Sequence, residues 1–289
     1  MPLAIFSQND GARRLGKVIG DTVVDLSVAA PDLPGDVVGF LAAGERALPV
    51  YRSIGADAPG RRALAEVRLH APVPSPEKYL AIGMNYSDHG AEAKRLGVEV
   101  PPWQLWFNKQ ISCINGPFDD VILPKVSEKT DYEAELAVVI GRACRYISPE
   151  EAPAVIGGYM IANDVSARDW QMRTGTMTLG KSFDTHGPIG PWLTLSEEVG
   201  DPHALDIRMF VNGEQRQAAN TSQLIYNIWE QISYLSQVMT LKPGDILATG
   251  TPAGVGVARN PPVFLKPGDV MRVEIAGLGH IENRVVAES

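Results

Sequence analysis

The stretch TDYEAELAVVIG, residues 130–141, places two acidic residues at the start of an apolar run. Its second half is short, apolar and rich in β-branched residues, which is typical of a buried strand. Glu133 and Glu135 lie two positions apart, and side chains at that spacing in a strand point to the same face. The stretch therefore predicts a strand that projects two carboxylates side by side.

The sequence around this strand predicts further strands and few helices. Six apolar segments are typical of strands: YLAIG (79–83), LWF (105–107), YMIAND (159–164), IRMFV (207–211), ILATG (246–250) and VMRVEI (270–275). Asn212-Gly213 follows one of them as a two-residue hairpin signal. Helices are predicted at residues 87–96, 148–156 and 221–239. The mixture predicts a strand-rich α+β fold.

The first part of the chain has a different pattern. Residues 2–27 alternate apolar and polar side chains in short runs, which predicts a hairpin or meander, and residues 37–54 have helical periodicity. The segment APVPSPEK, residues 71–78, contains three prolines in eight residues and is typical of a linker. We expect a small N-terminal α/β domain at residues 1–70 and a larger domain at residues 71–289.

Composition excludes several function classes. The 289 residues include 26 Lys and Arg against 34 Asp and Glu, a formal charge of −8, with no basic stretch, so nucleic acid and anionic membranes are poor partners. The first ten residues lack the apolar region of a signal peptide. Residues 152–163 form the longest uncharged apolar segment, well short of the roughly 20 residues of a membrane-spanning helix. Cys113 and Cys144 make no disulfide framework. These observations predict a cytoplasmic protein.

One motif match is misleading. GTMTLGKS, residues 175–182, satisfies the phosphate-binding pattern GxxxxGK[ST]. That loop requires an apolar strand before it and a helix after it, so that the helix N-terminus faces the phosphates. DWQMRT precedes the match, and FDTHGPIGP follows it with two prolines in the place of the helix. Nucleotide binding is therefore not expected.

Three acidic residues form a candidate metal site. Asp164 ends the predicted strand YMIAND, about one strand–helix–strand connection after Glu133 and Glu135. Three carboxylates together repel one another unless a cation lies between them, and an all-oxygen set suits Mg²⁺, Mn²⁺ or Ca²⁺. The alternative is that Glu133 and Glu135 line a solvated face of a sheet. Spacing alone favours that alternative.

Other candidates surround these carboxylates in the sequence. His89 and Glu92 lie three residues apart on a predicted helix, where a carboxylate orients an imidazole for general-base catalysis. The alternative is helix capping, with Glu92 near the positive N-terminal end.

Lys181, Arg168 and Gln171 are polar groups able to hold a carboxylate or an enolate oxygen, and each taken alone is typical of an ordinary surface residue. TGTPAGVG, residues 249–256, either brings backbone amides to a ligand or forms a glycine-rich turn.

Five blocks in this order resemble the fumarylacetoacetate hydrolase family. They are GMNYSDHGAE, TDYEAELAVVIG, IANDVSARDWQ, LGKSFD and GDILATGTPAGVG, within residues 78–285. The resemblance implies a mixed β-sandwich roll as the catalytic domain, and residues 1–70 resemble the small N-terminal domain of longer members. It also implies a homodimer.

By position, the resemblance makes Glu133, Glu135 and Asp164 the ligands of a divalent metal, Mg²⁺ or Mn²⁺, with Ca²⁺ as a substitute. It implies the following roles for the remaining candidates: water activation by His89, support of that histidine by Glu92, polarisation of a substrate oxygen by Lys181, and substrate contacts by Arg168, Gln171 and Thr251. His186 receives no role.

The implied reaction is metal-dependent hydrolysis of a carbon–carbon bond in a small anionic β-diketo acid, of the acylpyruvate or diketo sugar acid type. Metal stabilises the departing enolate while His89 activates water. The same site suits decarboxylation of a β-keto acid such as oxaloacetate, or keto–enol tautomerisation. A non-catalytic ligand-binding protein is the alternative outside enzymes. Asn85 stands where members that cleave fumarylacetoacetate have a further aspartate, so the shorter acylpyruvate- and oxaloacetate-acting relatives are the nearer resemblance.

Overall fold

The computed structural model describes residues 1–8, 11–95, 97, 99 and 101–289. At its centre lies strand β11 (Ala134–Ile140), all of whose residues are buried. This strand pairs antiparallel with β12 (Ile156–Asn163) on one side and with β17 (Ile246–Ala248) on the other. The strand predicted within residues 130–141 is therefore confirmed, and it occupies the interior of the main sheet.

The main sheet runs in the order β4-β3-β2-β1-β14-β12-β11-β17-β6-β7, with β5 paired to β1 and β8 paired to β14. Its remaining strands are β1 (Leu3–Ser7), β2 (Arg14–Ile19), β3 (Thr22–Asp25), β4 (Arg61–Ala63), β5 (Arg68–His70), β6 (Tyr79–Gly83), β7 (Leu105–Asn108), β8 (Ile114–Asn115) and β14 (Gly187–Leu195). Most neighbours are antiparallel, but β17 pairs with β6 and β14 with β8 in parallel, so the sheet is mixed.

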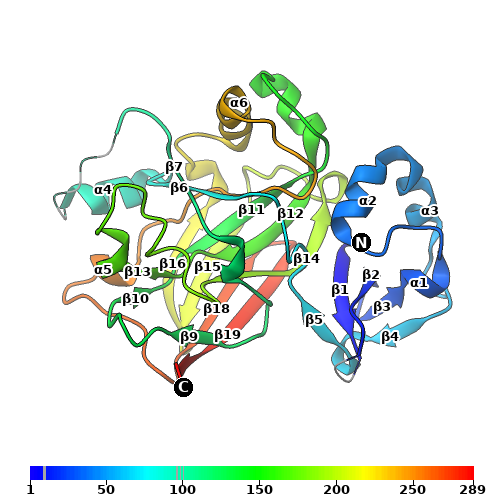
Figure 1. The fold of residues 1–289 in the computed structure, drawn as a ribbon, viewed down its shortest axis with the longest axis horizontal. Helices are drawn as coiled ribbons and strands as arrows, with labels where there is room; N and C mark the ends of the chain where they lie inside the picture. The colour runs from blue at the N-terminus through cyan, green and yellow to red at the C-terminus, as the bar shows by residue number, and fades with distance from the viewer. Residues whose placement is uncertain (9–10, 96, 98, 100) are drawn as a thin grey trace.

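A second sheet has the order β16-β15-β18-β19-β9 (Figure 1). Its strands are β9 (Val121–Leu123), β15 (Asp206–Val211), β16 (Glu214–Asn220), β18 (Val270–Ile275) and β19 (Gly279–Ala287), and a short pair is formed by β10 (Thr130–Asp131) and β13 (Ser166–Ala167). Asn212 and Gly213 both have positive φ in the turn between β15 and β16, as the hairpin signal predicts.

Both faces of β11 are covered. Leu136 and Val138 belong to a core shared with Met209 and Val273 of the second sheet. Ala137 lies on the opposite face, in a separate apolar core. Glu135 has the same parity along the strand as Ala137, so its carboxylate lies on the face away from the second sheet.

Helices and 3₁₀ turns lie between the strands along the chain. They are α1 (Leu26–Ala29), α2 (Val37–Ala43), α3 (Leu48–Ser53), α4 (Ser87–Arg95), α5 (Arg168–Gln171) and α6 (Ile228–Val238), with 3₁₀ turns η1 (Gly44–Arg46), η2 (Leu64–Glu66), η3 (Ile111–Cys113), η4 (Pro149–Val155), η5 (Ser196–Glu198), η6 (Thr221–Gln223) and η7 (Gly256–Ala258). The helix predicted at residues 148–156 is the 3₁₀ turn η4. The strand-rich α+β fold is confirmed. None of the helices within the described residues is long and apolar enough to span a membrane.

The helix predicted over residues 221–239 is wrong in its first part, because α6 begins only at Ile228. The Asn85 side chain forms hydrogen bonds with backbone groups that a longer helix would use for its own hydrogen bonds. Its side-chain oxygen accepts a hydrogen bond from the Tyr226 N–H at 2.9 Å, and its Nδ2 donates to the Tyr226 carbonyl at 3.1 Å. Asn227 then caps α6 in a capping box with Glu230.

The N-terminal residues, blue in Figure 1, lie beside β14 and join the same sheet. Leu3 of β1 is paired with Leu193 of β14. The proposed boundary between residues 1–70 and 71–289 falls between β5 and β6 and stays a prediction. One sheet continues across it.

Candidate functional site

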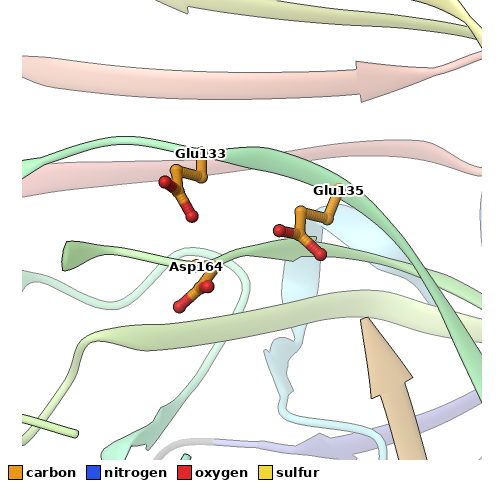
Figure 2. A group of neighbouring side chains, drawn as sticks. All are labelled: Glu133, Glu135 and Asp164. Carbon is orange, nitrogen blue, oxygen red and sulfur yellow. The ribbon is translucent and has the colours of Figure 1, made fainter. Parts of the chain in front are cut away.

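Three carboxylates meet at the end of the main sheet where β11 begins. Glu133 directly precedes β11, Glu135 lies within it, and Asp164 directly follows β12 (Figure 2). Because Ala134 is paired with Asn163 in the antiparallel ladder, the end of β12 lies beside the start of β11. One oxygen of each carboxylate lies within 4.8 Å of the other two.

These carboxylates do not line a solvated sheet face. Glu133 is 4% exposed, Glu135 1% and Asp164 0%. Buried carboxylates at this separation require nearby positive charge. The alternative that spacing alone favoured is therefore wrong, because strands and loops cover this face of β11.

Cationic side chains neutralise two of the three carboxylates. Lys181 Nζ donates to Glu133 Oε2 at 2.6 Å and to Asp164 Oδ2 at 2.7 Å. Lys109 Nζ donates to the other oxygen of Asp164 at 2.6 Å. Arg168 Nη1 lies 2.6 Å from Glu133 Oε1. Glu133 and Asp164 thus have both oxygens paired.

Glu135 differs, since no ion pair with it is found among the described residues, and it accepts a hydrogen bond from the Gly250 N–H at 2.9 Å. Burial, together with the negative charges of Asp164 and Glu133, raises the pKa of Glu135 well above its usual range. Burial alone would also raise the pKa of Glu133, but Arg168 and Lys181 outweigh it and hold that pKa well below its usual range.

This donor set fits a hard divalent cation. Three carboxylates offer oxygen ligands, which Mg²⁺ and Mn²⁺ prefer. Glu135, the carboxylate without a cationic partner, is the group whose charged form such an ion would stabilise most. The predicted ligands are therefore brought together in an arrangement able to hold a metal.

His89 and Glu92 lie on α4 beside this cluster. His89 Nδ1 is 3.1 Å from Glu92 Oε2, and Glu92 Oε1 accepts a hydrogen bond from the Gly254 N–H at 3.0 Å. Both carboxylate oxygens of Glu92 are therefore directed at the imidazole and at a neighbouring loop. With Nδ1–H donating to Glu92, Nε2 is the unprotonated nitrogen and the acceptor of a proton.

A small cavity of about 60 Å³ is lined both by carboxylates of the cluster and by His89. Of the nine candidate residues, all but Glu92 and Asp164 line it. Its volume lies far below that of pockets for drug-sized ligands, roughly 300–1,000 Å³. A larger cavity of about 680 Å³ lies at the opposite end of β11, beside α2, and contains none of the candidates.

Arg168 and Gln171 occupy the short helix α5. Arg168 Nη1 donates to Gln171 Oε1 at 3.1 Å, and Arg168 Nε donates to Asp131 Oδ2 at 2.9 Å. Asp131 is fully buried and also accepts hydrogen bonds from the Gly256 and Val257 N–H groups at 2.7 and 2.9 Å. Arg168 is therefore fixed in place by carboxylates and is not a mobile surface side chain.

Sequence reasoning missed two charged residues of this cluster, Lys109 and Asp131. Each is 2% exposed or less. Neither carries a local signal, because their partners lie far away in the sequence. His186, which received no role, is fully buried, with Nε2 3.0 Å from the Ile122 carbonyl oxygen. Burial and the nearby Lys109 ammonium lower its pKa to about 3, so it is a neutral core residue.

The strand-rich fold thus brings a buried carboxylate cluster, two lysines and a His–Glu pair together beside a small cavity, an arrangement able to bind a metal ion. Residues 78–286 match the family described as fumarylacetoacetate (FAA) hydrolase C-terminal. The chain belongs to the fumarylacetoacetate hydrolase family, as the resemblance of the five sequence blocks implied.

Relatives of known name cover most of the chain. It is 48% identical over 269 residues to the oxaloacetate tautomerase FAHD2A, mitochondrial, of Bos taurus, covering 92% of this chain and 85% of that protein. It is 44% identical over 291 residues to the oxaloacetate tautomerase fahd2, mitochondrial, of Xenopus laevis, covering 99% and 90%.

Solved structures have the same fold. The maleylpyruvate hydrolase of Sphingobium sp. SYK-6, in complex with manganese (II) ion and pyruvate, superposes with a TM-score of 0.83 at 35% identity over 100% of both chains. The 2-hydroxyhepta-2,4-diene-1,7-dioate isomerase of Mycobacterium marinum superposes with a TM-score of 0.77 at 33% identity, covering 100% of this chain and 99% of that one. The family thus includes both hydrolases and isomerases.

Proposed function

We propose that this chain catalyses keto–enol tautomerisation of a small β-keto dicarboxylic acid of the oxaloacetate type, with a bound divalent cation. The observation that carries the proposal is the small cavity that His89 and Lys181 line together with the buried carboxylates Glu133 and Glu135. Relatives named oxaloacetate tautomerases, 44–48% identical over nearly the whole chain, favour this substrate class. From the sequence alone, hydrolysis is the expected reaction and tautomerisation an alternative to it.

The metal would be held by Glu133, Glu135 and Asp164. Bound there, a divalent cation polarises the keto oxygen of the substrate and stabilises negative charge on it. Manganese in the Sphingobium structure is in keeping with Mg²⁺ or Mn²⁺ as the ion.

The chain's own residues supply the proton transfer. Tautomerisation removes one proton from the carbon next to the keto group and adds one to the keto oxygen. His89, with Nδ1 directed at Glu92, presents Nε2 as the base for the carbon-bound proton. Lys181 presents an ammonium group at the wall of the cavity, where it stabilises developing negative charge on a substrate oxygen. That oxygen takes up its proton from solvent as the enol leaves, and His89 returns the proton it gained to solvent. No attacking water is required.

Hydrolysis of a carbon–carbon bond is the second candidate. The His89–Glu92 pair is also the arrangement that activates a water molecule, and the Sphingobium relative is named a maleylpyruvate hydrolase. In this reaction His89 takes a proton from water, the resulting hydroxide adds to a carbonyl carbon, and the enolate departs.

Product analysis distinguishes the two reactions. The protein is incubated with oxaloacetate or with each of a series of acylpyruvates, in the presence of Mg²⁺ or of chelator. Enol content is followed by ultraviolet absorbance, and products are identified by mass spectrometry. We expect metal-dependent acceleration of enol–keto exchange of oxaloacetate with no change of mass. Cleavage of an acylpyruvate into two acids would transfer the assignment to the hydrolase, and loss of CO₂ to a decarboxylase. If neither substrate responds to metal, the proposal is wrong.

We also propose that the protein is a homodimer. Ile111 and Leu179 are 46% and 52% exposed. They lie on two loops that are connected by a hydrogen bond from the Gln110 N–H to Ser182 Oγ at 2.9 Å. A second copy of the chain would cover these exposed apolar side chains. A monomer mass in solution scattering would contradict the proposal. The cytoplasmic location stays a prediction, and the two vertebrate relatives are named mitochondrial proteins.

A further inference from the structure

Thr251 has a partner in the second sheet that the sequence does not indicate. Thr251 is 4% exposed and lines the same cavity as Glu133 and Glu135. Gln217, 1% exposed, is the one fully buried residue of β16 and reaches toward the main sheet. Its Nε2 donates a hydrogen bond to Thr251 Oγ1 at 2.8 Å.

Two backbone groups fix the orientation of the Gln217 amide. The Ala134 N–H donates to Gln217 Oε1 at 3.0 Å, and Gln217 Nε2 donates its second proton to the Pro252 carbonyl at 2.7 Å. Reversing the amide would place a donor against the N–H and an acceptor against the carbonyl, and both groups are buried. Nε2 therefore faces Thr251.

The orientation of this amide determines the role of the Thr251 hydroxyl. A hydroxyl that accepts from an N–H keeps its own proton to donate elsewhere. No atom of the described residues accepts that proton from Thr251. Because Thr251 lines the cavity, we take this free proton as available to a ligand bound there.

We propose that Gln217 is a positioning residue that makes Thr251 a hydrogen-bond donor to an anionic oxygen, a carboxylate or enolate, of the bound keto acid. The inference rests on the proposed function, since it requires a keto acid in this cavity. Gln217 also holds Ala134, which lies between Glu133 and Glu135. One amide therefore sets the hydroxyl at a fixed position relative to the metal-binding strand.

The inference is tested by measuring how much Thr251 contributes with and without the Gln217 amide. The probes are Mn²⁺ alone and then oxalate added to the Mn²⁺-loaded protein, each followed by calorimetry. In the wild type, Thr251→Val removes the hydroxyl at constant shape and weakens oxalate binding about tenfold, equivalent to about 1.4 kcal/mol. Affinity for Mn²⁺ alone changes by less than about threefold.

In a Gln217→Glu background the ionised carboxylate accepts the Thr251 proton, so the hydroxyl has none left for the ligand. The titrations are repeated at pH 8, because burial favours the protonated form of this carboxyl, which would donate as the amide does. Thr251→Val then weakens oxalate binding by less than about twofold, because the added charge is present on both sides of the comparison. Gln217→Met, which frees the hydroxyl to rotate, gives an intermediate loss and is used if the Glu variant does not fold. Gln215→Glu places the same charge on an exposed position of β16 and leaves the tenfold loss intact.

An equal loss from Thr251→Val in the wild type and in both Gln217 backgrounds overturns the inference, since Gln217 then has a purely structural role. Failure of the premise, a keto acid bound with a metal in this cavity, looks different, because the wild-type protein then binds neither Mn²⁺ nor oxalate; failure of the tautomerase assignment alone appears in the product analysis and leaves both affinities in place. Thermal unfolding of each variant measures the structural cost separately. A lower unfolding temperature with the tenfold loss unchanged counts against the inference.

Discussion

The two ends of β11 contrast in how they bury charge. Where the strand ends, one buried carboxylate, Asp245, accepts hydrogen bonds at 2.8 Å from Lys78 Nζ and from the Lys242 N–H. Where the strand begins, four carboxylates lie with three cationic side chains. These are Asp131, Glu133, Glu135 and Asp164 with Lys109, Arg168 and Lys181.

The difference suggests a criterion: buried charges that balance one another serve the fold, whereas a buried cluster that does not balance serves binding. Asp245 and Lys78 balance each other, and their ion pair joins two segments of the fold. The cluster at the start of β11 would have one negative charge in excess with all four carboxylates ionised, and Glu135 is the carboxylate without a cationic partner. Unbalanced buried negative charge is costly unless a bound cation compensates it. The excess thus points to binding.

The largest effect is expected from removing metal ligands. The double variant Glu133→Gln with Glu135→Gln should lose Mn²⁺ affinity by at least about a hundredfold, because two oxygen ligands lose their charge. Asp245→Asn, at the other end of β11, should bind Mn²⁺ within about threefold of wild type. Calorimetry with MnCl₂ measures both. Retained binding in the double variant contradicts the ligand assignment.

Removing the proposed base, His89, at the start of β11 should impair catalysis without weakening metal binding. His89→Ala is expected to lower kcat about a hundredfold, the typical contribution of a general base. Affinity for Mn²⁺ should be unchanged, because His89 forms no bond to the three carboxylates. Glu92→Gln should have a smaller effect on kcat. Full activity of His89→Ala would assign proton transfer to another group.

Asp131 and Asp245 form a matched pair, since both are fully buried carboxylates that hold a cation and backbone N–H groups. Asp131→Asn and Asp245→Asn should each lower the free energy of unfolding by about 3 kcal/mol, because each removes a fully buried negative partner from an ion pair. Only Asp131→Asn should also raise KM, about tenfold, since it releases Arg168. Urea unfolding measures the change in the free energy of unfolding, and steady-state kinetics measure the change in KM. Equal KM values would make Asp131 purely structural.

The smallest effect concerns His186, which lies near the cluster but is neutral. Its folded-state pKa of about 3 lies below the usual 6.5, so the unfolded chain takes up a proton first as pH falls. The stability from this group is complete above pH 6.5 and is lost toward pH 3, by roughly 2 kcal/mol at pH 5. Urea unfolding at pH 7 and pH 5 measures it. His186→Asn should lose correspondingly less stability between these pH values, and an equal loss contradicts the prediction.

Local patterns predicted the elements whose cause is local. The run at residues 134–140 predicts a buried strand because a continuous apolar, β-branched segment satisfies a sheet interior by itself. The helix at residues 221–239 failed for the opposite reason. Its apolar periodicity is helical, but Asn85, more than 130 residues earlier, binds the backbone of Tyr226. Hydrogen bonds from a distant side chain override periodicity.

By itself, the sequence determined the family, the strand-rich fold and the nine candidate residues, because motif order and strand periodicity are properties of neighbouring positions. Only the tertiary structure revealed Lys109, Asp131 and Gln217. Lys109 meets Asp164 across 55 residues, and Gln217 meets Ala134 across 83. An ion pair or a buried amide is decided by which side chains share a desolvated space, and that space exists only once the two sheets have packed.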